Sequence, residues 1–173
     1  KIYVPLVSEI ENLFLIPKVI ELDAKKQNIE NVDDLLEQTK AKTIEFLQEH
    51  LEEQSLLFAK KRCQNTINNI CNQPTSTIEE YKASLDGVVD IVNPQEEYNK
   101  VREELQKIID DKDYLAALKV INNKGLLPST NLPNVFGWKK QYYIEYVIRL
   151  LESKDSASEE LCDIFREYVP VEI

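Results

Sequence analysis

Two glutamates and an asparagine near the start of the chain are the strongest candidates for chemistry. Glu9, Glu11 and Asn12 lie in the stretch SEIENLFLIP, directly after the β-favouring segment KIYVPLV. If Glu9 stays extended, its carboxylate and that of Glu11 share one face and could bind a divalent cation together, whereas helical positions i and i+2 point apart. The alternative is structural, because Ser8 as N-cap and Glu11 at the third helical position fit a capping box.

Few basic residues are candidates for phosphate contacts. Lys60, Lys61 and Arg62 form the strongest basic cluster, and Lys124 lies in the turn-rich stretch NNKGLLPSTNLPNVFG. The formal net charge of −10 disfavours broad, nonspecific binding of nucleic acid, since that binding depends on Lys and Arg neutralising phosphates. Basic triplets on helices are also commonly solvated faces, so both interpretations stay open.

Several other chemistries have no support in this sequence. The only glycines are Gly87, Gly125 and Gly137, so a G-x-x-x-x-G-K-[ST] phosphate loop is absent. The single histidine, His50, lies among glutamates and glutamine, which gives no support for a catalytic triad or a His-rich metal site. The three cysteines lack C-x-x-C spacing and are predicted to be reduced thiols.

Most of the chain is predicted to be helical. Pro17 suits the first turn of a helix over PKVIELDAKK, and an apolar face predicts one long helix from Asn31 to about Asn72. Capping patterns predict further helices from residues 76–79, 93–96 and 156–159, and two more cover about 113–122 and 139–153. NNKGLLPSTNLPNVFG is predicted to be an irregular loop. The fold class is therefore mainly α, a helical bundle with one long helix.

The segment KIYVPLV is predicted to be a single N-terminal strand, and one strand cannot satisfy its own backbone groups. Because the chain also has no methionine and begins at Lys1, we expect a piece of a longer protein. No apolar run approaches the roughly 20 residues that span a bilayer, and the N-terminus lacks the pattern of a signal peptide. We therefore expect no membrane partner and a cytoplasmic location.

The opening segment YVPLVSEIENLFLIPKVI resembles a signature of Toprim-like nuclease modules. These modules accompany ABC-type ATPases in OLD-family (overcoming lysogenization defect) and related anti-phage proteins. The element that carries the resemblance is Glu9-Ile10-Glu11-Asn12, and INNKGLL and REYVP are similar to segments in a branch known only as a domain of unknown function. The resemblance implies that residues 1–16 end a Toprim-like α/β core and that residues 17–173 form a C-terminal helical domain.

The same resemblance implies a metal-dependent nuclease that acts with an ABC-type ATPase domain in cis or in trans, in defence against phage. Mg²⁺ or Mn²⁺ would activate water and stabilise the leaving oxygen on a nucleic-acid substrate. By analogy, Glu11 and Glu9 would be catalytic metal ligands and Asn12 would orient one of them. The candidate phosphate contacts are Lys60, Lys61, Arg62 and Lys124.

This chain departs from the family pattern in one important respect. The upstream glutamate and the strand-end aspartate pair are missing, and Asp111-Lys112-Asp113 follows a predicted helix rather than a strand. We therefore predict that the chain is inactive alone and holds no ion tightly. The alternative is a non-catalytic helical interaction or oligomerisation module, in which the long helix and an aromatic group bind a partner or a second copy. That group is Trp138, Tyr142, Tyr143 and Tyr146.

Overall fold

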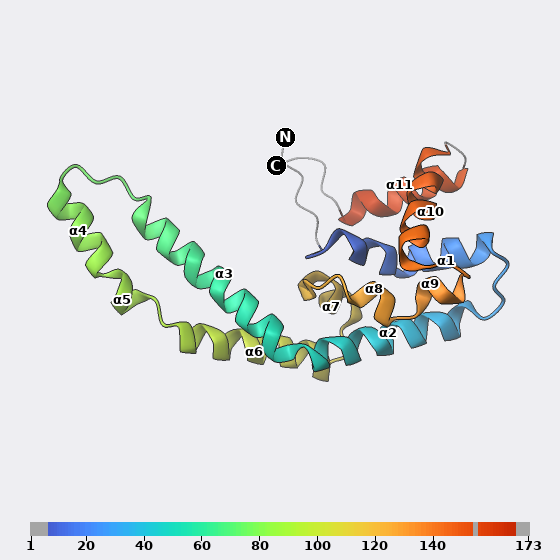
Figure 1. Cartoon of the computed structure of the whole chain (residues 1–173), viewed down its shortest axis with the longest axis horizontal. Helices are drawn as coiled ribbons and strands as arrows, with labels where there is room; N and C mark the ends of the chain where they lie inside the picture. Colours follow the sequence, from blue (N-terminus) through green and yellow to red (C-terminus); the bar gives the residue numbers. More distant parts are fainter. Residues whose placement is uncertain (1–6, 154–155, 169–173) are drawn as a thin grey trace. The chain divides into compact units, whose positions relative to one another are not determined.

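The computed structural model describes residues 7–153 and 156–168. Every regular element within these ranges is a helix, which confirms the prediction of a mainly α-helical bundle (Figure 1). The predicted strand falls on residues 1–7, nearly all of which lie outside the described residues. Among the described helices, none combines the length and the apolar character needed to cross a membrane.

The chain divides into two compact units. The first unit comprises Lys1–Glu49 and Ile108–Ile173, and the second unit comprises His50–Lys107. In the first unit, the side chains of Gln48 and Ile109 line one groove, so the chain leaves and re-enters this unit at neighbouring positions. The predicted division after residue 16 rests on the family resemblance and stays a prediction.

The first unit is built around a well-filled apolar core. Its elements are η1 (Ile10–Leu15), α1 (Pro17–Lys26), α2 (Val32–Glu49), α7 (Tyr114–Val120), α8 (Leu126–Ser129), α9 (Leu132–Val135), α10 (Lys140–Glu152) and α11 (Ser156–Tyr168). Helix α1 packs against α2 and α11, α10 packs against α11, and α7 packs against α2. Leu15, Ile20 and Leu161 are fully buried in this core. Pro17 begins α1 as predicted, because a residue at the first helical position has no intrahelical use for an N–H.

The stretch predicted as one long helix is two helices. Helix α2 ends at Glu49 and α3 runs over Leu51–Cys71, with His50 between them at φ −106° and ψ 15°. Leu47 and Leu51 are both buried, so the apolar pattern continues across the break. The prediction of a single helix is therefore wrong at His50, where the first unit ends and the second begins. Helical periodicity reports only local spacing, so it does not reveal a break that tertiary structure imposes.

The predicted irregular loop is also more ordered than expected. It contains the short helices α8 and α9, and the side chains of Leu126, Leu127 and Leu132 are buried. These three leucines anchor the segment to the core, which is why its prolines and glycines do not leave it unstructured.

The second unit consists of α3, α4 (Ile78–Asp86), α5 (Val88–Ile91) and most of α6 (Pro94–Asp110). Helix α4 has no buried residue. The predicted capping box at residues 76–79 is displaced by one residue, since Thr77 is the N-cap and its side chain accepts from the Glu80 N–H. The predicted cap of α6 is correct, because Asn93 Oδ1 accepts from the Glu96 N–H.

Candidate functional site

The E-I-E-N element lies at the beginning of η1. Glu9 is its extended N-cap, at φ −123° and ψ 137°, which is the conformation that a shared face with Glu11 requires. The capping box predicted for Ser8 is wrong. The Ser8 hydroxyl instead donates to the carbonyl oxygen of Lys119, at 2.5 Å. Glu11 therefore does not take part in a capping box with Ser8, which was the structural alternative to a role in metal binding.

Asn12 fastens the element to the end of α7. Its side chain is buried, with 1% exposure, and its Nδ2 donates to the carbonyl oxygens of Leu118 at 2.9 Å and Ile121 at 2.8 Å. Carbonyls at a helix C-terminus have no intrahelical partner, so Ser8 and Asn12 together form a side-chain cap, the α7 clamp. Both hydrogens of Nδ2 are used in it. Only the Asn12 oxygen remains for the orienting role that the family resemblance implies.

Glu11 is held by a lysine that sequence analysis did not identify. Its Oε2 forms an ion pair with Lys140 Nζ at 2.6 Å, and the two side chains are 17% and 31% exposed. The same ammonium donates to the carbonyl oxygen of Lys124 at 2.8 Å. Three distant segments therefore meet at Glu11, Lys124 and Lys140, which we call the Glu11 bridge. Lys140 stands at the first position of α10, where no local pattern indicates a partner.

The loop next to Lys124 is tightly packed. A Cβ added to Gly125 would lie 3.0 Å from Asn123 Oδ1 and 3.4 Å from the Phe46 ring. Asn123 Oδ1 also accepts from the Gly125 N–H at 2.8 Å. A larger residue at position 125 would therefore push against the side chains of Asn123 and Phe46.

One edge of a metal site fits these residues. Mg²⁺ is commonly bound by one or two carboxylates together with water and phosphate oxygens. Glu9 and Glu11 could supply such carboxylates, but nowhere in residues 7–153 and 156–168 do three or more metal-binding side chains form a group that could hold an ion. The remaining ligands would have to come from outside this group. Lys140 already holds Glu11 Oε2, so Glu11 would offer an ion its Oε1 while that pair is kept.

The other predicted phosphate contacts lie in the second unit, on α3. Arg62 is engaged by Glu104 in a two-point pair, with Nη1–Oε1 at 3.1 Å and Nη2–Oε2 at 2.6 Å. That carboxylate raises the pKa of Arg62, and Arg62 lowers the pKa of Glu104. Lys60 and Lys61 are exposed. Of these three residues, Arg62 therefore already has an intramolecular ion-pair partner, Glu104.

A second acidic group, also missed from the sequence, lies beside α10. Asp23 on α1 is fully buried, and Tyr143 donates its hydroxyl to Asp23 Oδ2 at 2.8 Å. Asp23 Oδ1 finds no hydrogen-bond partner among the described residues. Burial raises the pKa of Asp23 to about 6, against the opposing effects of Tyr143 and Lys26. Lys140 and Tyr143 are one turn apart, so a single turn of α10 contacts both acids.

The aromatic group serves packing in part. Tyr143 stacks on Phe136, with ring centroids 5.5 Å apart, and meets Phe14 edge-on. Trp138 stacks on Tyr146 at 5.6 Å, while Tyr142 is 53% exposed. The group therefore splits between the core and the surface.

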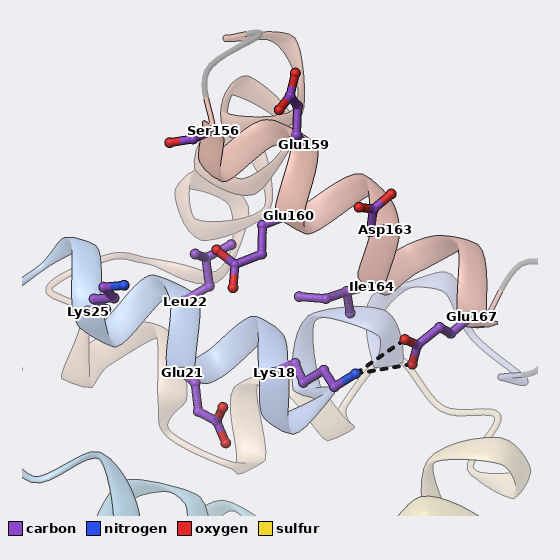
Figure 2. Close-up of a pocket in the computed structure, with 10 residues that line it drawn as sticks. All are labelled: Lys18, Glu21, Leu22, Lys25, Ser156, Glu159, Glu160, Asp163, Ile164 and Glu167. Atoms are coloured by element: carbon purple, nitrogen blue, oxygen red, sulfur yellow. Dashed lines mark hydrogen bonds and ion pairs between the residues drawn. The ribbon is translucent and has the colours of Figure 1, made fainter.

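A cavity of about 740 Å³ lies between α1 and α11, and none of the three residues of the Glu11 bridge lines it (Figure 2). Its lining is predominantly acidic: Lys18, Glu21, Leu22, Lys25, Ser156, Glu159, Glu160, Asp163, Ile164 and Glu167. Figure 2 shows Lys18 reaching Glu167, at 3.2 Å, across one end. None of the candidate site residues predicted from the sequence lines it, and its negative charge disfavours phosphate groups.

The chain was compared with family models, curated proteins and solved structures, and no significant match was found in any of the three comparisons.

Proposed function

We propose that this chain is the helical part of a Toprim-like, metal-dependent nuclease that works with an ABC-type ATPase domain. One observation carries the proposal: the element that carries the resemblance, E-I-E-N, lies in direct contact with INNKGLL, one of the two other segments similar to that family. Asn12 bonds to Ile121, and Lys140 joins Glu11 to Lys124. Segments that meet in space, although they are far apart in the chain, support a shared role.

In this proposal, Glu11 and Glu9 form one acidic edge of a composite site, and the α7 clamp fixes that edge on a packed helix. Rigid support of this kind is what a metal ligand needs. A bound Mg²⁺ or Mn²⁺ supplies the activation of water and the stabilisation of the leaving oxygen. The substrate is nucleic acid, the ATPase is on the same chain or a partner, and the protein acts in the cytoplasm in defence against phage.

The test is metal-dependent cleavage by the full-length protein. Mg²⁺ and Mn²⁺ are titrated with DNA and with RNA, using wild type, Glu11→Gln and the matched control Glu21→Gln at an exposed position of α1. We expect cleavage to require metal, to fall at least about 100-fold in Glu11→Gln and to persist in the control. Cleavage that is indifferent to Glu11→Gln, or absent on both substrates, contradicts the proposal.

A second candidate function, a homo-oligomerisation module, is favoured by the surface of α4. Ile78, Tyr81 and Leu85 lie at positions i, i+3 and i+7, so they share one face. Their exposed fractions are 71%, 37% and 40%. The same stripe of a second copy would bury this apolar face.

Sedimentation velocity of the full-length protein tests this second candidate. Wild type should associate as its concentration rises, and Leu85→Asp should remain a monomer. Ala83→Asp, an exposed position of the same helix, is the control that should still associate. A wild-type protein that is monomeric at all concentrations contradicts the candidate.

A further inference from the structure

One face of α10 carries cations and aromatic rings together. Its members are spaced at i, i+3, i+7 and i+10, which places them on one side of the helix over a length of about 15 Å. They are Lys139 at the N-cap, Tyr142, Tyr146 and Arg149, which we call the α10 stripe. Tyr142 is 53% exposed, and the two cations are exposed as well. Neither cation forms an ion pair within the part of the chain that the structure describes.

Trp138 adds a third ring to this face and is held from two sides. Helix α9 ends in a Schellman motif, in which the Trp138 N–H donates to the Pro133 carbonyl oxygen at 2.8 Å. Gly137, at φ 73°, supplies the left-handed residue that this motif requires. The Trp138 ring stacks on Tyr146 with the ring planes 18° apart, yet Trp138 remains 38% exposed. Its exposed area therefore lies away from the face that Tyr146 covers, on a ring that is already fixed in place.

The composition of the stripe favours one kind of ligand. The net charge of −10 disfavours broad contact with nucleic acid, so any such contact has to be local. The charged members of the stripe are both cations, and the nearby acids of α10, Glu145 and Glu152, fall outside its spacing. Exposed rings with cations beside them match the bases and phosphates of a single strand, whereas a duplex keeps the faces of its bases stacked.

We propose that the α10 stripe, together with Trp138, binds single-stranded nucleic acid. Bases stack on the exposed rings of Trp138 and Tyr142, and the flanking phosphates contact the two cations of the stripe. This inference rests on the proposed function, since it takes nucleic acid to be the substrate, and it names the class of nucleic acid. Lys140, at the start of the same helix, holds Glu11, so one turn of α10 connects the stripe to the proposed acidic edge.

The test measures binding of fluorescein-labelled oligo(dT) and oligo(U), about 12 nucleotides long, to the full-length protein by fluorescence anisotropy. EDTA is present, so that metal-dependent cleavage is suppressed. We expect at least one single strand to bind more tightly than a duplex of the same length. Tyr142→Ala should weaken this binding about tenfold, through the loss of one stacked base, and Tyr142→Phe should bind as wild type does. The matched control is Ile148→Ala, which truncates a 44% exposed side chain on another face of α10.

The phosphate contacts are tested separately, by the dependence of binding on salt. Each phosphate contact to a single strand contributes about −0.7 to the slope of log K against log salt concentration. Lys139→Gln and Arg149→Gln should therefore each make the slope shallower by about 0.7. Lys25→Gln, at an exposed position of α1, should leave it unchanged. These variants replace exposed charged side chains, so they decide the proposal even if Tyr142→Ala fails to fold.

The possible results separate the two proposals. If wild type binds no single strand, or Tyr142→Ala binds as Ile148→Ala does, the proposed role of the α10 stripe is wrong, while cleavage lost in Glu11→Gln would still support the nuclease. Binding through the stripe without metal-dependent cleavage supports the stripe and contradicts the nuclease. If Tyr142→Ala abolishes self-association in sedimentation velocity but leaves oligonucleotide binding unchanged, the stripe is a protein contact and the proposal is overturned.

Discussion

The two units use the same secondary structure and are stabilised in different ways. In the first unit, large side chains such as Leu15, Ile20 and Tyr143 are fully buried, and buried polar groups tie distant segments together. In the second unit, α4 buries nothing, α3 and α6 bury fewer large side chains, such as Val101 and Leu105, and exposed charge pairs such as Arg62 with Glu104 also join these two helices. The comparison teaches that helical content alone says little about where the folding free energy lies.

The largest expected effect is a core truncation in the first unit. Ile20→Ala removes a fully buried side chain and should lower the free energy of unfolding by about 2 to 5 kcal/mol. Leu56→Ala in the second unit, where the side chain is 48% exposed, should change it by less than about 0.5 kcal/mol. Urea denaturation measures both variants, and similar losses would contradict the link between the burial of Ile20 and the stability of the first unit.

The next effect depends on pH. Because the folded chain raises the pKa of Asp23 from 3.8 to about 6, it binds that proton more tightly than the unfolded chain does. The resulting stability is present below pH 3.8 and is lost as the pH rises through about 6, by up to about 3 kcal/mol.

Asp23→Asn keeps an acceptor for Tyr143 and removes the charge, so this decline should disappear. Above pH of about 6 the variant should be more stable than wild type. Urea denaturation across this pH range is the measurement, with Asp111→Asn at an exposed position as the control. Parallel curves for Asp23→Asn and wild type would contradict the role of the buried charge.

A smaller loss is expected from breaking the α7 clamp. Asn12→Ala leaves the carbonyls of Leu118 and Ile121 without the side-chain donor that they have in the folded chain, which should cost about 2 kcal/mol. The control is Asn69→Ala, an exposed asparagine of α3, which should not lower stability. If the two variants melt alike, the clamp does not stabilise the first unit.

The smallest effect belongs to the second unit. Arg62→Ala removes the pair with Glu104, whose side chains are 43% and 55% exposed, and should cost less than about 1 kcal/mol. The loss should shrink further at high salt, because exposed charges are screened. Urea denaturation at low and high salt, with Lys61→Ala as control, is the measurement. A cost above that of Asn12→Ala would reverse the proposed ranking.

Sequence reasoning succeeded where structure is local. The start of α1 at Pro17 and the cap of α6 at Asn93 depend on residues within one turn, and both were predicted. The capping box predicted for Ser8 is wrong because the Ser8 hydroxyl bonds to Lys119, far away in the chain, rather than to its own helix. Lys140 was missed for the same reason. Glu11 was singled out, but its neighbours in space come from α10 and from the loop before α8, which no local spacing reveals.

Gln48 and Ile109, which lie next to the two ends of the second unit, line the same groove of the first unit. Since the backbone departs from the first unit and returns to it at adjacent points, residues 50–107 have the connectivity of an insertion. Insertions joined at neighbouring points can lengthen, shorten or change sequence without altering the host fold. The Glu11 bridge and the α7 clamp are made entirely by residues of the first unit, so a substitution in residues 50–107 removes no partner from either.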